Sequence, residues 1–117
     1  MFRCLRGIAF ITAIILNCGA AFAEDTTSAN YVMAGCRAFL LPKIPHDINL
    51  SLIAGVCAGI VSGINYAAAD VCPPKGVTSV QSVRIVVNYI DGRPARLNEN
   101  FNALALEALR AAWPCKN

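Results

Sequence analysis

The sequence predicts an all-α domain, built as a small disulfide-bonded bundle of about four antiparallel helices. Apolar residues recur every three or four positions in four segments, which is the spacing of one face of a helix. Glycine and proline residues separate these segments, and the connections are short, so successive helices should run antiparallel. The cysteines that follow the N-terminal leader are even in number, as in small secreted domains held by disulfides.

Residues 1–23 have the pattern of a secretory signal peptide. Arg3 and Arg6 give a positive start, and residues 7–18 form an apolar run. The run is followed by residues 21–23, Ala-Phe-Ala, which form an A-x-A cleavage site. We therefore expect this leader to be recognised for its hydrophobicity and removed after export.

Two other interpretations of the leader are disfavoured. A lipoprotein signal needs a small residue before the cysteine, but Asn17 precedes Cys18. A membrane anchor needs about 20 apolar residues, and this run is shorter. Residues 24–117 should then form one domain in an oxidising compartment, where disulfides persist.

The composition of the mature chain excludes several classes of protein. Its net charge falls from +3 to +1 when the two leader arginines are removed, which gives no electrostatic basis for binding nucleic acid or an anionic membrane surface. There is no C-x-x-C pair and a single histidine, so neither a thioredoxin-like site nor a zinc site is indicated. We expect no cofactor and no metal. Two disulfides should join the four remaining cysteines, Cys36, Cys57, Cys72 and Cys115.

The first helix is predicted over residues 28–41. Its apolar side chains fall on one side at helical spacing, and Pro42 and Pro45 end it because proline cannot donate to the helix ladder. The short segment before it, residues 24–27, is expected to lack order.

The second helix is predicted over residues 49–69 and carries two rows of residues spaced by four. One row is apolar, and the other consists of Gly55, Gly59 and Gly63. Because each glycine costs about 1 kcal/mol of helix propensity, we expect the glycines to let a neighbouring helix approach closely. The segment also resembles a membrane helix, since it has no charged residue. Its polar side chains nevertheless favour a helix of a soluble domain, without stable membrane insertion. These side chains are Asn49, Ser51, Ser62 and Asn65. We expect the helix to lie at the centre of the domain, buried nearly all round.

The third and fourth helices are predicted to begin near residues 78 and 98. Thr78 and Gln81 have the spacing of a capping box, which favours a helix over a strand for the valine-rich run 83–90. Glycine and proline end this helix near residue 92. The fourth helix should extend to residue 113 and end at Pro114.

The antiparallel order of the helices selects one of the three possible disulfide pairings. The turn between the first two helices brings Cys36 and Cys57 to a similar height. The second and fourth helices both end at the opposite end of the bundle, where Cys72 and Cys115 should meet. We predict the pairs Cys36–Cys57 and Cys72–Cys115.

No arrangement of residues that would support catalysis is found. His46 and Asp47 are adjacent in a proline-rich turn, where a solvent-exposed histidine is the simpler interpretation. Residues 59–63, Gly-Ile-Val-Ser-Gly, look similar to the G-x-S-x-G motif of a nucleophile elbow, but Ser62 stands one position too late. The remaining carboxylates are scattered at helix ends and exposed positions. The sequence therefore predicts a protein that is not an enzyme and has no catalytic residues.

Several segments of the mature chain resemble the Rap1a/Tai family of small periplasmic immunity proteins. Cysteine, glycine and proline landmarks occur in the same order as in that family. The segments that carry the resemblance are 57–63 (Cys-Ala-Gly-Ile-Val-Ser-Gly), 71–78 (Val-Cys-Pro-Pro-Lys-Gly-Val-Thr), 86–90 (Val-Val-Asn-Tyr-Ile), 93–97 (Arg-Pro-Ala-Arg-Leu) and 108–115 (Ala-Leu-Arg-Ala-Ala-Trp-Pro-Cys).

The resemblance implies a helical, disulfide-bonded periplasmic domain that is often dimeric. Members of the family bind and neutralise peptidoglycan-cleaving amidases delivered by type VI secretion. The leading hypothesis is therefore an immunity protein with a secreted amidase as its partner. The alternative is a small periplasmic protein of the same fold with a structural, chaperone-like or stress role. A gene for a secreted amidase next to this one would favour the first.

An immunity protein of this kind would act by occluding its partner. Its binding surface should then lie on polar positions outside the framework residues. The third helix and the turn after it offer the densest set of such residues. Arginine, which is common among interface hot spots, is frequent in this set. Its members are Arg84, Asn88, Asp91, Arg93 and Arg96.

Overall fold

The computed structural model describes residues 24–43 and 45–116. The predicted leader lies outside the described residues. Within them, four α-helices and one short 3₁₀-helix follow one another along the chain, and no strand is present beyond two isolated bridges. Their bounds are α2 Ala29–Phe39, α3 Ile48–Ala67, α4 Ser79–Asp91, η1 Pro94–Arg96 and α5 Phe101–Ala112. The all-α class is confirmed, and each α-helix begins and ends within about one turn of its predicted bounds.

Three of the helices begin at a side chain that accepts a hydrogen bond from the first turn. Thr78 Oγ1 accepts from the backbone N–H of Gln81 at 3.1 Å, as the predicted capping box requires. Asn100 caps α5 and Asp47 caps α3 in the same way. Because such a cap satisfies a backbone donor that the helix itself leaves free, it sets where the helix starts. The valine-rich run of α4 is therefore helical, as its cap predicts.

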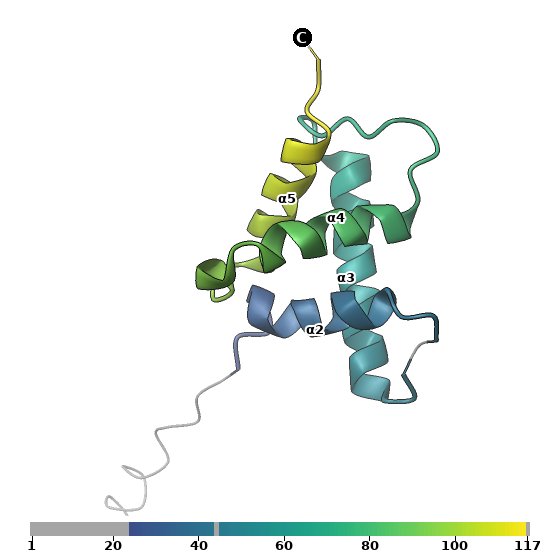
Figure 1. Cartoon of the computed structure of the whole chain (residues 1–117), viewed down its shortest axis with the longest axis vertical. Helices are drawn as coiled ribbons and strands as arrows, with labels where there is room; N and C mark the ends of the chain where they lie inside the picture. Colours follow the sequence, from purple (N-terminus) through teal and green to yellow (C-terminus); the bar gives the residue numbers. More distant parts are fainter. Residues whose placement is uncertain (1–23, 44, 117) are drawn as a thin grey trace, which may run out of the picture.

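The helices do not share one axis. Figure 1 shows α3 upright, with α2 and α4 lying across it at two heights and α5 beside its upper part. The segments before and after α3 contain prolines and are long enough to turn the chain through a wide angle. The helices therefore pack by crossing, whereas short connections alone suggested that successive helices would run antiparallel.

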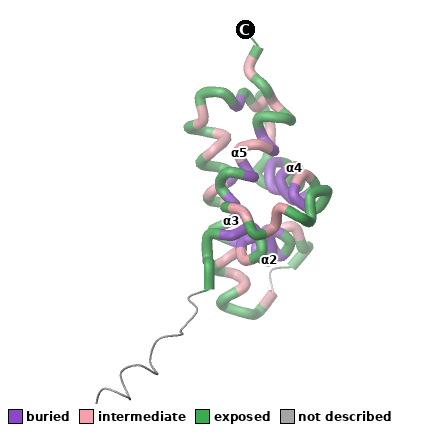
Figure 2. The backbone as a smooth tube through the Cα atoms, turned by 90° about the vertical axis from the view of Figure 1, so that its left-hand side faces the viewer, coloured by how far each residue is buried: buried purple, intermediate pink, exposed green. Residues whose placement is uncertain are grey.

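The core lies where α2, α4 and α5 meet one side of α3. The buried segments in Figure 2 gather on α2, α4 and α5, and α3 is mostly intermediate or exposed. The largest side chains that are almost completely buried are Phe101, Met33, Ile90, Leu104 and Leu109. Trp113 packs against this core at the end of α5.

The prediction that α3 is buried nearly all round is wrong. Ala54, Cys57 and Val61 are the buried residues of this helix. Leu52 is 67% exposed and Tyr66 is 96% exposed, on the opposite face. The cause is the size of the domain: three short helices cover only one side of a helix of 20 residues.

The predicted role of the α3 glycines as contact points within the domain is also wrong. A Cβ atom added to Gly55, Gly59 or Gly63 would meet nothing within 4 Å. The close approach is made by Gly35 of α2, where an added Cβ would collide with the backbone and side chain of Ile53. Gly35 is therefore the residue that lets α2 lie directly on α3.

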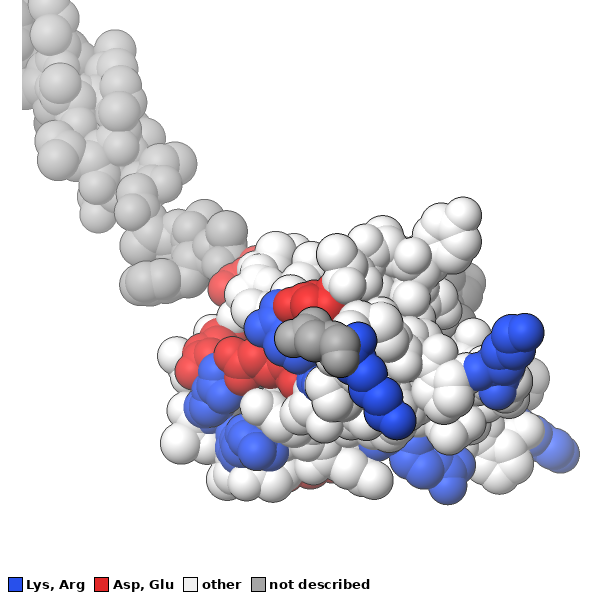
Figure 3. Space-filling view, turned by 90° about the horizontal axis from the view of Figure 1, so that it is seen from above, with Lys and Arg blue, Asp and Glu red and all other residues white. Residues whose placement is uncertain are grey.

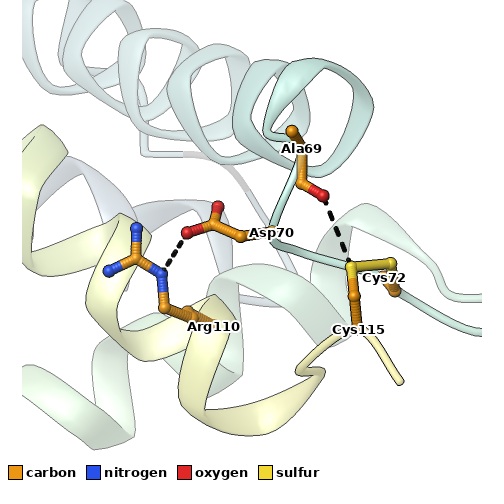
Figure 4. Close-up of a disulfide and its surroundings, with 5 residues drawn as sticks. All are labelled: Ala69, Asp70, Cys72, Arg110 and Cys115. Carbon is orange, nitrogen blue, oxygen red and sulfur yellow. Dashed lines mark hydrogen bonds and ion pairs between the residues drawn. A yellow bond between two sulfur atoms is a disulfide. The ribbon is translucent and has the colours of Figure 1, made fainter. Parts of the chain in front are cut away.

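Both predicted disulfide pairs are confirmed. Cys36 and Cys57 are fully buried where α2 crosses α3, and their Cα atoms are 5.3 Å apart. Cys72 and Cys115 join the α3–α4 loop to the segment after α5, with Cα atoms 5.0 Å apart. Figure 4 shows the second bridge beside the ion pair of Asp70 with Arg110. The Cys72 N–H also donates to the Trp113 carbonyl at 2.9 Å, so the loop and the C-terminal segment are held together twice.

The first residues after the predicted cleavage site are ordered, contrary to expectation. Asp25 accepts hydrogen bonds from the backbone and the hydroxyl of Thr27, at 3.0 and 2.6 Å. The Thr27 carbonyl in turn accepts from the N–H of Phe101 at 2.8 Å. The segment before α2 is thus attached to the start of α5, far away in sequence.

Candidate functional site

The outer face of α4 presents three of the predicted partner-binding residues. The inner face of α4 is anchored in the core by its valines and Ile90. Arg84, Asn88 and Asp91 follow at spacings of four and three residues, so they project together on the other side, and all are exposed. Among the described residues, no ion pair involves Arg84. The α4 face therefore offers a cation and an amide directly to solvent.

Asp91 ties the end of this face to α2. Its carboxylate accepts a hydrogen bond from Arg37 at 2.6 Å, and both side chains are about half exposed. An exposed pair of this kind contributes little stability, about 0–1 kcal/mol. Its effect is to bring the guanidinium of Arg37 into the same surface as the α4 residues.

Arg93 lies flat on Tyr89. The guanidinium carbon is 3.6 Å from the centroid of the Tyr89 ring, and a guanidinium nitrogen donates to the Tyr89 carbonyl at 2.8 Å. A cation stacked on an aromatic ring loses little by becoming buried against a partner, because the ring already replaces part of its hydration. The stack makes Arg93 an exposed but positioned cation.

Arg96 is engaged within the chain. Its guanidinium donates to both carboxylate oxygens of Glu99, at 2.9 and 2.8 Å, and to both of Glu107, at 2.8 and 3.0 Å. These hydrogen bonds lower the pKa of Glu99 and of Glu107 and raise that of Arg96. Tyr89 adds a hydrogen bond to Glu107 at 3.2 Å. Arg96 therefore fixes the η1 turn to α5, and its predicted role in partner binding stays a prediction.

The five predicted residues fall in two groups with different tasks. Arg84, Asn88 and Asp91 follow one side of α4. Arg93 and Arg96 contact Tyr89 and Glu107 on the side of α4 that faces α5. The two groups together form the candidate surface. We call this surface, formed by α4, η1 and the facing end of α2, the α4–η1 surface. The predicted set of partner-binding residues did not include three of its members: Arg37, Tyr89 and Glu107. The spacing of four residues between Tyr89 and Arg93 was a usable sign of the stack. No sequence pattern linked Arg37 to Asp91, because these residues are 54 positions apart.

The charges of the molecule are unevenly distributed. In the view from above, acidic side chains gather on one side next to basic ones, and much of the remaining face is uncharged (Figure 3).

Among the described residues, no three His, Cys, Asp or Glu side chains lie close enough together to hold a metal ion. Asp47, the neighbour of His46, is used as the cap of α3.

A small polar hollow lies between α3 and the start of α4. Its volume is about 260 Å³, and the caps and hydroxyls around Thr78 line it. Asn65 donates to Ser82 Oγ at 2.7 Å at its edge, and Ser82 donates to the Thr78 carbonyl at 3.2 Å. The hydrogen bond between Asn65 and Ser82 thus joins α3 to α4, whereas the buried Oδ1 of Asn65 has no hydrogen-bond partner among the described residues.

Comparison with known proteins identifies the family. The sequence model described as Rap1a immunity proteins matches residues 15–115, which include all four α-helices and both disulfides. The chain belongs to the Rap1a immunity protein family. No curated protein and no solved structure gives a significant match to the chain.

Membership of the Rap1a family assigns this chain to proteins that bind a partner effector, as inhibitors rather than enzymes. The two disulfides fit an oxidising compartment. For a Rap1a immunity protein, the α4–η1 surface combines what protein interfaces favour: exposed arginines, an aromatic ring and a rigid helix beneath them.

Proposed function

We propose that this protein is a periplasmic immunity protein that binds and inhibits a peptidoglycan-cleaving amidase effector of type VI secretion. Membership of the Rap1a family is the observation that carries the proposal. The predicted leader and the two disulfides support a periplasmic location. The partners are then the secreted effector and, following the family, a second copy of the chain.

The α4–η1 surface is the proposed contact with the effector. Arg84 has no ion-pair partner among the described residues and can therefore pair with a carboxylate of the effector, and Arg93 is already oriented by its stack on Tyr89. Pre-orientation lowers the entropy that a side chain loses when it is buried in an interface. Inhibition follows from covering the entrance to the effector's active site, and needs no chemistry of the immunity protein itself.

The test is binding to a secreted amidase encoded next to this gene. Replacing Arg84 and Arg93 together by alanine should weaken the complex at least ~30-fold, because one interface hot spot contributes about 2 kcal/mol or more. Neither side chain is buried, so the melting temperature should stay nearly unchanged. The matched control removes the same charge elsewhere, with Lys43 and Lys116 replaced by alanine.

Two outcomes would count against the proposal at different levels. Equal affinities of the arginine double variant and the lysine control would move the interface away from the α4–η1 surface. Failure of the wild-type protein to bind or inhibit any neighbouring secreted hydrolase would favour the alternative, a periplasmic protein with a structural or chaperone-like role.

A further inference from the structure

The polar hollow between α3 and the start of α4 has the composition of a ligand site. Ser62, Asn65 and Tyr66 line it from α3, and residues 77–79 and Ser82 line it from the other side. Hydroxyl groups, one amide and one aromatic ring therefore surround it. No Asp, Glu, Lys, Arg or His is among the residues that line it. Because a charge needs a partner when it leaves water, the hollow suits a neutral polar ligand better than an ion.

The inner part of the hollow holds an acceptor that the protein itself does not use. Asn65 donates to Ser82 Oγ at 2.7 Å, and Ser82 donates in turn to the Thr78 carbonyl at 3.2 Å. The Oδ1 atom of Asn65 is buried and has no hydrogen-bond partner among the described residues. A buried acceptor without a donor is costly, so an N–H or O–H group brought by a ligand would stabilise this position.

The outer part of the hollow offers groups that are available to a ligand. Ser62, Tyr66 and Ser79 are exposed, and none of their side chains forms a hydrogen bond with another described residue. Ser79 is also the first residue of α4, so its N–H has no acceptor within that helix. The hollow therefore presents donors at its mouth and an unused acceptor at its base.

Tyr66 gives the hollow a flat aromatic wall. Its side chain is 96% exposed, so the ring takes no part in the core. The face of an aromatic ring carries partial negative charge and attracts the slightly positive C–H groups of a saturated ring. Val77 lines the hollow as a second apolar side chain. A ligand with both polar groups and a C–H face would use both kinds of wall.

We propose that this hollow binds a neutral sugar that carries an acetamido group. The acetamido N–H would donate to Asn65 Oδ1, and its carbonyl would accept from the Ser79 N–H. The N–H and C=O of a trans amide point in opposite directions, so one meets the base and the other the mouth. The sugar ring would then lie against Tyr66. The volume of about 260 Å³ is just below the range of about 300–1,000 Å³ found for drug-sized ligands, which suits a single sugar ring.

A peptide fits the hollow less well than a sugar. Peptides are recognised by sheet edges, apolar grooves, aromatic grooves for proline-rich segments or clusters of arginine. The residues that line the hollow form none of these, and the described part of the chain has no strand beyond two isolated bridges. The hydroxyl groups at the mouth can each donate and accept, as the hydroxyl groups of a sugar require.

The site goes beyond the proposed function and uses other residues than the α4–η1 surface. In the periplasm, the glycan strands of the cell wall carry acetamido sugars. Binding to them would hold the inhibitor beside the wall that its effector cleaves, a consequence that rests on the proposed function. The binding itself does not rest on it, because the effector takes no part in the site.

The test is an NMR titration of the exported, purified and isotope-labelled protein. With N-acetylglucosamine, the side-chain amide signal of Asn65 and the backbone signal of Ser79 should shift, with a Kd of about 1 mM for a ligand of this size. Glucose lacks the acetamido group and should bind about 10-fold more weakly, because a hydrogen bond is lost. N-acetylglycine methylamide has amide groups but no sugar ring and should cause no comparable shift.

Variants of Tyr66 test the aromatic wall without disturbing the core. Tyr66→Ala should weaken binding at least ~3-fold, and Tyr66→Phe should restore most of it, because the ring is kept. Leu52→Ala is the matched control: Leu52 is also an exposed side chain of α3, at 67%, but lies outside the hollow, so this variant should bind like the wild type. Asn65→Leu should abolish the preference for N-acetylglucosamine over glucose, and the Tyr66 variants keep the test valid if Asn65→Leu does not fold.

Four results would overturn the proposal. The first is no shift of the Asn65 and Ser79 signals at several times the expected Kd. The others are equal binding of glucose, equal binding by Tyr66→Ala and the wild type, and binding of N-acetylglycine methylamide as tightly as the sugar, which would assign the hollow to peptides. None of these results bears on effector binding, so this proposal and the proposed function fail separately.

Discussion

Gly35 gives the sharpest test of how the domain is packed. A Cβ atom at this position would collide with the backbone carbonyl of Ile53, at the point where α2 crosses α3. The neighbouring residue, Cys36, is bonded to Cys57 of α3, so the crossing cannot open to relieve the collision. The substitution Gly35→Ala therefore adds one methyl group at the least adaptable contact in the molecule.

Two effects of opposite sign determine the size of the change. Alanine gains about 1 kcal/mol over glycine in helix propensity. Overpacking a core costs about 1–3 kcal/mol, and the upper end applies because the collision is with backbone atoms. The free energy of unfolding should therefore fall by about 2 kcal/mol. For a domain of this size, that lowers the melting temperature by about 8–16 °C.

The control is Gly55→Ala, on the open face of α3. A Cβ added there meets nothing within 4 Å, so the propensity gain is not offset, and the melting temperature should rise by about 4–8 °C. Both variants are measured by thermal circular dichroism at low concentration, where a dimer does not contribute. A rise for Gly35→Ala, or the same shift for both variants, would refute the assigned packing of α2 on α3.

Two further predictions concern the covalent bridges and the response to acid. Cys72 is exposed whereas the Cys36–Cys57 bridge is fully buried, so a mild reductant on the native protein should open the Cys72–Cys115 bridge first, as peptide mapping after alkylation would show. Simultaneous opening of both bridges would contradict this order. Arg96 lowers the pKa of its two carboxylate partners below the ordinary value of 4.5, so their stabilising effect is present above that pH and is lost as the pH falls. The free energy of unfolding of Arg96→Ala should therefore fall less between about pH 7 and about pH 3 than that of the wild type, and parallel curves would contradict it.

The α4–η1 surface shows why a binding site is only partly readable from sequence. Arg84, Asn88 and Asp91 share a helix face because of their spacing, and that much is local. Whether each cation is available to a partner depends on distant residues. Arg96 is occupied because α5 brings Glu107 to it, whereas no ion pair within the described residues involves Arg84.

The sequence by itself determined the helices and the disulfide partners. Helix boundaries follow from caps and breakers within a few residues, as at Thr78, where the side chain binds the first turn of α4. The valine-rich run of α4 is helical for the same local reason. Cys36, Cys57, Cys72 and Cys115 admitted three pairings, and the pairing selected from an antiparallel order of helices is the observed one, although the helices cross.

The tertiary structure decided which faces of these helices are covered. The apolar composition of α3 suggested burial all round, but three short helices cover a single side of it. The glycine that meets a neighbouring backbone proved to be Gly35 of α2, while the more regular row on α3 faces open space. Periodicity shows that a side chain lies on a given face of its own helix. Contact with a second helix depends on the crossing point and direction of that helix, which are set by packing of residues distant in sequence.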